Sequence, residues 1–315
     1  MKKFIALLLS LVMVCMALAA CGGGGGESND GAAEAPNAGD PIRITSFGDT
    51  AGEVFAQILE QELMYKGYEI EDCERMDVYA FRDAMINDKV DMVMDYEGDG
   101  PSYMGDDVDL MEFQKNGWQM VSEWDLENND LVWFNPSEAN NVGVIVCTKE
   151  TAEANNLSTF ADFADYVKNG GETKLVGPEF WIDGEYKFLL MEKAYNFKLD
   201  RNTQVQYAEG TNEKMCAEGV DGVNFAVAWA HSGSINVLDL VPLKDEQETT
   251  MRYSYCPVIR KDVLDQYPEI RDIIEPIFEA VTDDDARWLN EQVEANGRPA
   301  DEVAIEYLTN KGWME

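Results

Sequence analysis

Residues 41–67 read PIRITSFGDTAGEVFAQILEQELMYKG, and this pattern predicts one strand followed by one amphipathic helix. The first part, residues 42–47, is a short run typical of a strand. Asp49 or Thr50 can cap the helix that follows, and Gly67 ends it. Apolar residues at helical spacing form one face of this helix: Val54, Phe55, Ile58, Leu59 and Leu63. A strand that leads into an amphipathic helix indicates an α/β fold.

Strands and helices alternate along the rest of the chain. The most strand-like runs are residues 142–148 (VGVIVCT) and 223–229 (VNFAVAW), and residues 90–94 form another buried strand. A second helix is predicted to carry Phe81, Ala84 and Met85, and further helices are predicted at residues 158–170, 268–281, 282–295 and 299–311. The alternation predicts an α/β architecture with mostly parallel sheets, in which ligands bind at the carboxyl ends of strands.

The first residues of the chain have the pattern of an export signal. Two lysines, Lys2 and Lys3, precede an apolar run that ends in Leu-Ala-Ala-Cys at residues 18–21, which resembles a bacterial lipobox. We therefore expect residues 1–21 to be a lipoprotein signal peptide, with Cys21 as the lipidated residue; the alternative is a plain secretory signal. Residues 22–40 are rich in Gly, Ala and acids and predict a flexible tether. The expected location is extracytoplasmic, anchored to the cell membrane.

Composition excludes some partners. The chain of 315 residues has 61 acidic and 24 basic side chains, which gives a formal net charge of −37. This charge argues against nucleic acid or an anionic membrane surface as a partner, because both require clustered Lys and Arg. Apolar residues make up 45% of the chain, which is typical of a globular protein, and the length suits two lobes.

Signals for catalysis are weak. The chain has no G-x-S-x-G, P-loop or G-x-G-x-x-G motif, and its one histidine, His231, follows a strand and is interpreted as a loop or hinge residue. Acidic residues are so frequent that no single carboxylate pair indicates an acid/base site. We predict that the protein is not an enzyme and needs no cofactor.

Metal and disulfide sites are also not expected. Residues 95–106 place acids at positions one, three, five and twelve and glycine at six, as in a calcium-binding EF-hand loop. However, position three is Glu97, position twelve is Asp106, and the preceding residues predict a strand rather than a helix. The cysteines of the body lack CxxC or zinc-like spacing, and no disulfide is predicted among Cys73, Cys147, Cys216 and Cys256.

Aromatic residues lie at strand ends or in the loops that follow them: Tyr96, Trp181, Tyr186, Trp229 and Tyr253. A quaternary ammonium has no N–H to donate, so proteins recognise it with aromatic faces and sometimes a nearby carboxylate. The alternative interpretation is that each of these aromatic residues belongs to the core.

Several segments, in order, resemble substrate-binding proteins of ABC importers for glycine betaine, choline and related osmoprotectants. They are Ser46 and Thr50, YKGY (residues 65–68), DMVMDYEG (91–98), KETAEANNLST (149–159), Glu179-Phe180, Lys193-Ala194-Tyr195, residues 253–264 and residues 302–313. The resemblance covers the chain from residue 41 to the end.

The resemblance implies a two-lobed α/β clamshell, the type II periplasmic-binding-protein fold, in which the chain crosses twice between the lobes. The crossings would lie at residues 140–144 and 229–233. Lobe one would then comprise residues 41–142 and 232–315, and lobe two residues 143–231. The ligand would bind in the cleft and favour the closed form, which the permease recognises.

The resemblance also implies binding residues. Tyr96 matches the aromatic residue of a P-E-Y-T-G turn, and Tyr253 matches a tyrosine beside the pocket. Tyr186 or Trp181 fills a position supplied by a D-G-Y segment, and Trp229 replaces a phenylalanine at the second crossing. The full predicted set is Phe47, Thr50, Tyr96, Asp99, Asn140, Asn141, Trp181, Tyr186, Trp229 and Tyr253.

Three departures from the family pattern concern the ligand. Phe47 stands where betaine-binding members have a lysine, the arginine after E-F is missing from residues 179–182, and Gly143 replaces a pocket tyrosine. Because a buried carboxylate needs a partner, these changes favour a cation without an obligatory carboxylate, such as choline or another amine. Two arginines are alternative carboxylate partners, and three acids are available as counter-charges: Arg82, Arg252, Asp95, Asp99 and Asp183.

The sequence thus predicts a lipid-anchored solute receptor of an ABC importer that binds a small quaternary amine or osmolyte. Its expected partners are the permease and ATPase subunits, and we expect a monomer. Two alternatives remain open: an extracellular enzyme or calcium-dependent module on the same tether, and a sensory binding protein for another small amine.

Overall fold

The computed structural model of the chain describes residues 35–105, 107–182, 188–200, 204–206 and 211–315. The predicted signal peptide, Cys21 and residues 22–34 lie outside the described residues. The last part of the predicted tether belongs to the folded body, because Asn37 is buried and exchanges two hydrogen bonds with the backbone of Glu69. No helix in the described part of the chain combines the length and hydropathy needed to cross a membrane.

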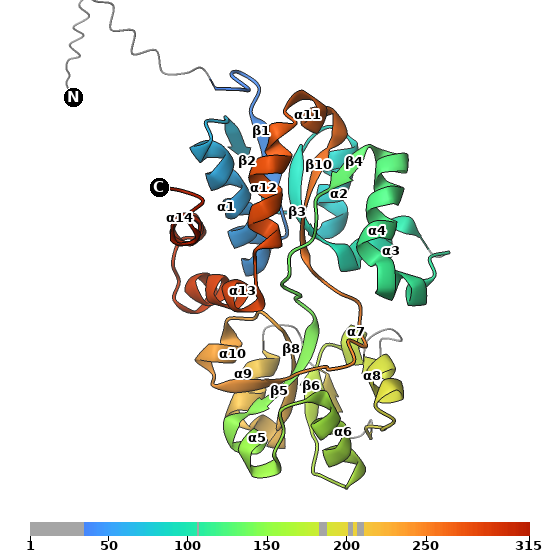
Figure 1. The fold of residues 1–315 in the computed structure, drawn as a ribbon. Coiled ribbons are helices and arrows are strands. Elements are labelled where there is room, and N and C mark those ends of the chain that lie inside the picture. Colours follow the sequence, from blue (N-terminus) through green and yellow to red (C-terminus); the bar gives the residue numbers. More distant parts are fainter. Residues whose placement is uncertain (1–34, 106, 183–187, 201–203, 207–210) are drawn as a thin grey trace, which may run out of the picture. The chain divides into compact units, whose positions relative to one another are not determined.

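The first lobe is built on a five-stranded sheet of order β2-β1-β3-β10-β4 (Figure 1). Its strands are β1 (Ile42–Thr45), β2 (Ile70–Asp72), β3 (Met92–Tyr96), β4 (Leu131–Trp133) and β10 (Tyr255–Arg260). Strand β1 runs parallel to β2 and β3, whereas β10 runs antiparallel to β3 and β4.

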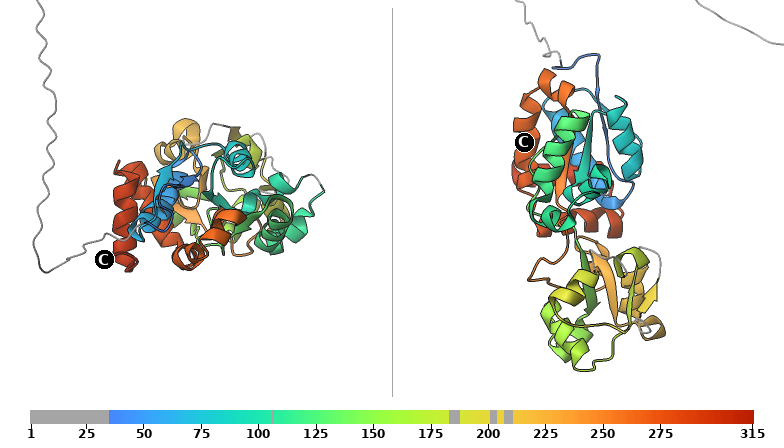
Figure 2. Two further views of the ribbon diagram at one scale, coloured as in Figure 1. Left: turned by 90° about the horizontal axis from the view of Figure 1, so that it is seen from above. Right: turned by 90° about the vertical axis from the view of Figure 1, so that its right-hand side faces the viewer.

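Helices cover both faces of this sheet (Figure 2). One face packs against α1 (Thr50–Tyr65), α12 (Glu269–Glu279), α13 (Asp283–Asn290) and α14 (Ala300–Lys311). The other face packs against α2 (Val78–Ile86) and α4 (Leu110–Asn129), with α3 (Gly100–Met104) beside α4. Helix α11 (Lys261–Gln266) follows β10, a 3₁₀ turn spans Glu97–Asp99, and a π-helical turn spans Glu291–Ala295.

The second lobe is built on a sheet of order β7-β6-β8-β5-β9. Its strands are β5 (Gly143–Thr148), β6 (Leu175–Gly177), β7 (Gln204–Gln206), β8 (Phe225–Trp229) and β9 (Leu240–Leu243). Its helices are α5 (Lys149–Asn155), α6 (Phe160–Lys168), α7 (Glu179–Ile182), α8 (Phe188–Ala194), α9 (Asn212–Glu218) and α10 (Ser234–Val237), with a 3₁₀ turn at Val220–Gly222.

As predicted, most strands of each sheet run in the same direction, but one strand in each sheet, β10 or β5, runs opposite to the other four. Each sheet is mixed, because β10 pairs antiparallel with β3 and β4, and β5 pairs antiparallel with β8 and β9. Strands β5 and β10 are the first to follow a crossing between the lobes. Each of these two strands enters its sheet from the other lobe. It therefore runs antiparallel to its neighbouring strands, which belong to strand–helix units.

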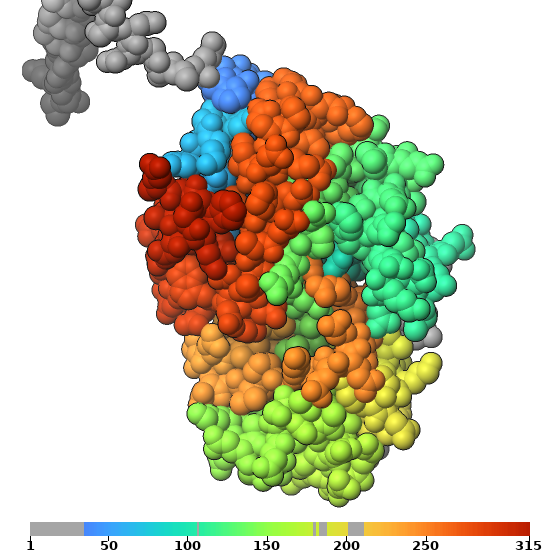
Figure 3. Space-filling model, in the orientation of Figure 1, coloured from blue at the N-terminus to red at the C-terminus, as the bar shows by residue number. Residues whose placement is uncertain are grey.

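The second crossing differs from its predicted position at residues 229–233. Strand β9 pairs with β5, so the chain returns to the first sheet through residues 244–254, and the first crossing is residues 134–142. Figure 3 shows the return segment, in orange, on the surface between the lobes. Residues 230–233 still lie at the junction, because Ala230 N donates to Val142 O and Gly233 N donates to Glu294 Oε2.

Candidate functional site

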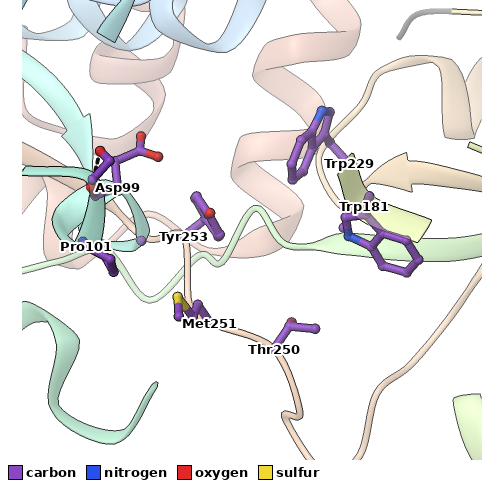
Figure 4. Close-up of a pocket in the computed structure, with 10 residues that line it drawn as sticks. Asp99, Pro101, Trp181, Trp229, Thr250, Met251 and Tyr253 are labelled. Carbon is purple, nitrogen blue, oxygen red and sulfur yellow. Dashed lines mark hydrogen bonds between the residues drawn. The ribbon is translucent and has the colours of Figure 1, made fainter. Parts of the chain in front are cut away.

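Two adjoining cavities lie between the lobes and share Asp99, Trp229 and Tyr253 in their walls. The larger has a volume of about 630 Å³ and the smaller about 230 Å³. Figure 4 shows the smaller cavity, with Asp99 and Pro101 on one side, Trp181 and Trp229 on the other, and Tyr253 between them.

The structure brings most of the predicted binding residues together. The larger cavity is lined by seven of them: Phe47, Thr50, Tyr96, Asp99, Asn141, Trp229 and Tyr253. Trp181 lines the smaller cavity. Asn140 lines neither, because its Oδ1 accepts from Tyr253 N at 2.7 Å and thereby fixes the backbone that carries Tyr253. Tyr186 and Asp183 lie outside the described residues.

Three of the five charged side chains proposed as partners or counter-charges for the ligand point elsewhere. Asp95 is buried away from both cavities and accepts from Tyr103 Oη at 3.0 Å. Arg82 is buried in an ion pair with Asp125. Arg252 lies 3.4 Å from Glu97 Oε1 and lines a separate hollow beside α4. None of the three lines the predicted site.

Four aromatic rings form a continuous wall of the larger cavity. The Phe47 and Tyr96 ring centroids are 5.2 Å apart, and the Tyr253 centroid lies 6.2 Å from both Tyr96 and Trp229. These rings come from the ends of β1, β3 and β8 and from the second crossing, so both lobes contribute. A wall of aromatic faces can attract a cation that has no hydrogen to donate.

Trp181 explains the missing pocket tyrosine at position 143. A side chain there would overlap the Trp181 indole, which is 2% exposed and lies directly over Gly143. The aromatic group is therefore supplied by the second lobe's α7 rather than by β5.

The charge of the cavity is set by acids. Asp49, Asp99, Glu213 and Glu294 all line the larger cavity, and no lysine or arginine does so among the described residues. Burial raises the pKa of Glu294, the nearby Glu213 raises it further, and the Gly233 N–H lowers it. Such a lining favours a positively charged ligand over an anion.

Asp49 also occupies the positive end of α1. Its carboxylate accepts from Gly52 N at 2.6 Å and caps the helix at the point where the helix meets the cavity. Gly52 is required there, because a Cβ would overlap the Phe47 carbonyl oxygen. A ligand carboxylate would have to compete with Asp49 for these N–H groups.

His231 joins the crossing segments beneath the cavity. Its Nε2 lies 2.8 Å from Asp283 Oδ1, its Nδ1 lies 2.9 Å from Tyr255 Oη, and its backbone N donates to Asn141 Oδ1. A carboxylate only accepts, so Nε2 carries the proton, and Nδ1 of the neutral ring accepts from the Tyr255 hydroxyl. Burial lowers the pKa of His231, and the Asp283 carboxylate opposes that shift. Both ring nitrogens are thus engaged within the protein.

Sequence reasoning missed much of the cavity wall. The residues not proposed as binding residues include Asp49, Glu213, His231, Ser232, Ser234, Asn290 and Glu294. The sequence predicts Asp49 only as a helix cap and His231 only as a loop or hinge residue. The others carry no motif, because they come from α9, the segment after β8, α10, α13 and the π-helical turn, whose placement depends on packing.

The features of a metal site are absent from the described residues, where no group of three or more His, Cys, Asp or Glu side chains could hold an ion. The segment that resembles a calcium loop starts inside β3, with Asp95 turned toward Tyr103. The four described cysteines are free thiols.

Comparison with known proteins identifies relatives of this chain. A family profile described as "Substrate binding domain of ABC-type glycine betaine transport system" matches residues 40–310. Glycine betaine-binding protein YehZ of Escherichia coli is 30% identical over 283 residues, which cover 88% of this chain and 93% of that protein.

Two solved structures are similar in fold. Apo YehZ from Escherichia coli has a TM-score of 0.77 at 30% identity and covers 87% of this chain and 99% of its own. A crystal structure described as a glycine betaine/carnitine/choline ABC transporter has a TM-score of 0.75 at 18% identity, covering 87% of this chain and all of its own. The second similarity concerns the fold alone.

Proposed function

The chain belongs to the family of substrate-binding domains of ABC-type glycine betaine transport systems, and we propose that its ligand is a small quaternary amine bound by the aromatic wall. Family membership makes it an extracytoplasmic substrate-binding protein of betaine or osmolyte transport rather than a member of an enzyme family. Its two-lobed α/β fold is that of type II periplasmic binding proteins and confirms the predicted fold class.

The aromatic wall is the observation that carries this proposal. The rings of Phe47, Tyr96, Tyr253 and Trp229 line one cavity together with four carboxylates and with no described Lys or Arg. Aromatic faces attract a quaternary ammonium, and the acids add a favourable field. Glycine betaine and choline both carry this group, so they are the first ligands to test.

Transport requires further steps that belong to the same proposal. Both lobes contribute rings to the cavity, so a ligand that contacts both favours the closed form. We expect this form to deliver the ligand to the permease, with the chain held at the membrane through a lipid on Cys21.

A thermal-unfolding panel tests the ligand class. The purified chain is scanned with choline, glycine betaine, carnitine, polyamines, amino acids, calcium and EDTA. A ligand at a hundred times its Kd raises the free energy of unfolding by about 2.7 kcal/mol, which raises the midpoint clearly. We expect quaternary amines to raise it, and calcium and EDTA to leave it unchanged.

Substitution of a wall residue locates the binding. Trp229→Ala removes one ring, and we expect it to weaken amine binding about tenfold. The matched control is Trp313→Ala, since Trp313 packs on the first-lobe core outside both cavities. If no amine shifts the midpoint, or if both substitutions affect binding equally, the aromatic wall is not the binding site.

A further inference from the structure

Two buried polar atoms in the wall of the larger cavity have no hydrogen-bond partner. They are Tyr96 Oη and Asn290 Oδ1, on side chains of residues that are 6% and 3% exposed. A buried polar group without a partner destabilises a fold, so most such groups in native proteins are satisfied by protein, water or ligand. Their position in a cavity wall indicates that a ligand supplies the partner.

The two atoms belong to one cluster in the first lobe. Tyr96 and Tyr255 are cross-strand partners on β3 and β10, with ring centroids 5.2 Å apart. The Tyr255 ring stacks with His231, and Asn290 Nδ2 donates to His231 O at 2.8 Å. Tyr96 and Asn290 are carried by β3 and α13 of the same lobe, so their relative positions do not depend on closure.

The hydrogen bonds around Asn290 fix what it offers to a ligand. The His231 carbonyl can only accept, so the Asn290 amide nitrogen faces it and Oδ1 points the other way. The Tyr255 hydroxyl donates to His231 Nδ1 and has no second proton for Asn290. Asn290 Oδ1 therefore remains an acceptor that requires a donor.

The backbone places Asn290 at an irregular point of the chain. It is the last residue of α13, and the π-helical turn Glu291–Ala295 follows directly. Both Asn290 and Glu294 line the cavity across this turn. Short π-helical turns inside helices occur frequently at functional sites.

The chemistry of the pair selects among ligands. Tyr96 can donate, and Asn290 Oδ1 can only accept. A hydroxyl group satisfies both atoms, because it accepts from Tyr96 and donates to Asn290. A carboxylate only accepts, so it would leave Asn290 unsatisfied and would lie in a cavity also lined by Asp49 and Glu294.

We propose that Tyr96 and Asn290 bind a neutral hydroxyl group of the ligand, so that the site selects a hydroxyl-bearing quaternary amine over a carboxylate-bearing one. This inference rests on the proposed function, since the Tyr96 ring also belongs to the aromatic wall that would hold the cation. The Phe47 ring, 5.2 Å from that of Tyr96, places this wall beside the hydroxyl position.

Calorimetric titration of the purified chain tests this with three ligands: choline, ethyltrimethylammonium, which lacks the hydroxyl, and glycine betaine, which has a carboxylate. We expect choline to bind about tenfold more tightly than ethyltrimethylammonium, as one net hydrogen bond of ordinary strength gives. Glycine betaine should bind more weakly than choline. This comparison needs no variant.

Substitution then assigns the preference to its residue. Tyr96→Phe keeps the ring and removes the hydroxyl, so it should weaken choline binding more than ethyltrimethylammonium binding and bring the ratio of the two Kd values close to one. The matched control is Tyr307→Phe, because the Tyr307 hydroxyl is also buried without a partner but lies on α14, outside the cavity.

The outcomes separate this inference from the proposed function. Equal binding of choline and ethyltrimethylammonium overturns the hydroxyl site but leaves the proposed amine receptor intact. Tighter binding of glycine betaine than of choline has the same meaning. A choline advantage that survives Tyr96→Phe also overturns it. If none of the three cations binds, the proposed function fails and this inference fails with it.

Discussion

At the residue scale, a missing side chain at one position is compensated by a ring from another element. Gly143 begins β5, and the Trp181 indole of α7 occupies the space above it. The sequence showed only that a pocket tyrosine was missing. The structure shows that the space is filled, so the cavity keeps an aromatic group at this end.

Substitution of Gly143 tests this packing. Gly143→Ala would force the buried indole to move, and we expect a loss of about 1–3 kcal/mol in the free energy of unfolding, as is typical of overpacking. Chemical denaturation measures it. The control is Gly48→Ala, where a Cβ meets no atom within 4 Å. Unchanged stability in Gly143→Ala would mean that Trp181 is not held in this position.

At the element scale, the side chains of strand β3 alternate between the face with the cavity and the opposite face of the sheet. Successive side chains of a strand point to opposite faces. Tyr96 faces the cavity, whereas its neighbour Asp95 faces the α4 side, where Tyr103 donates to it at 3.0 Å. Burial raises the pKa of Asp95, and the Asp99 carboxylate raises it further.

This shift predicts the pH dependence of stability. The unfolded chain ionises Asp95 near pH 3.9, while the folded chain holds the proton to higher pH. Stability contributed by Asp95 is therefore full below about pH 4 and falls as the pH rises toward the folded pKa. We expect Asp95→Asn, which imitates the protonated form, to flatten this fall in unfolding measured between pH 4 and 8.

A second carboxylate, that of Asp162, has a pKa shift of the opposite sign and serves as a control. Backbone N–H groups of Ser158 and Thr159 lower the pKa of Asp162, in the capping box of α6. The stability that Asp162 contributes is present above its pKa in the unfolded chain and is lost as the pH falls. If Asp95→Asn and the unmodified chain lose stability in parallel as the pH rises, Asp95 does not hold a proton in the folded state.

At the scale of the whole molecule, four segments meet where the lobes join, and His231 connects them. Asp283 accepts from His231 Nε2 and also from Asn140 N, and Tyr255 donates to His231 Nδ1. Arg287 is the cation that lowers the pKa of His231, in addition to burial. The first crossing, the segment after β8, β10 and α13 are thus held by one buried ring.

This arrangement predicts a loss of stability in acid. The unfolded chain protonates His231 near pH 6.5, whereas the folded chain resists protonation, so stability falls as the pH drops below about 6.5 toward the folded pKa. His231→Gln should lower stability at neutral pH and remove this part of the slope. His231 is the only histidine in the chain, so the difference between the two slopes can be assigned to it.

The matched control is Asp283→Asn. It weakens the same junction but keeps the imidazole, so its acid slope should persist. Equal slopes in the unmodified chain and in His231→Gln would show that the buried ring does not resist protonation.

The sequence by itself determined the local elements and the family. Helix α1 begins after the Asp49 cap as its spacing predicted, and Thr282, at the start of the helix predicted at residues 282–295, forms a capping box with Asp285. These features depend on neighbours within a few residues, so a local pattern is enough. The aromatic residues at strand ends could be predicted for a similar reason, because strand ends in α/β folds converge on the ligand.

Only the tertiary structure decided the mixed sheets, the second crossing at residues 244–254 and the presence of Asn290 and Glu294 in the cavity wall. Strand direction depends on which lobe the chain comes from, and β9 could be assigned only by its pairing with β5. Asn290 and Glu294 line the cavity because α13 and its π-helical turn pack against α1, and because Asn290 contacts His231; both are distant in sequence. Packing between distant segments sets the direction of such side chains, and a local sequence pattern does not contain that information.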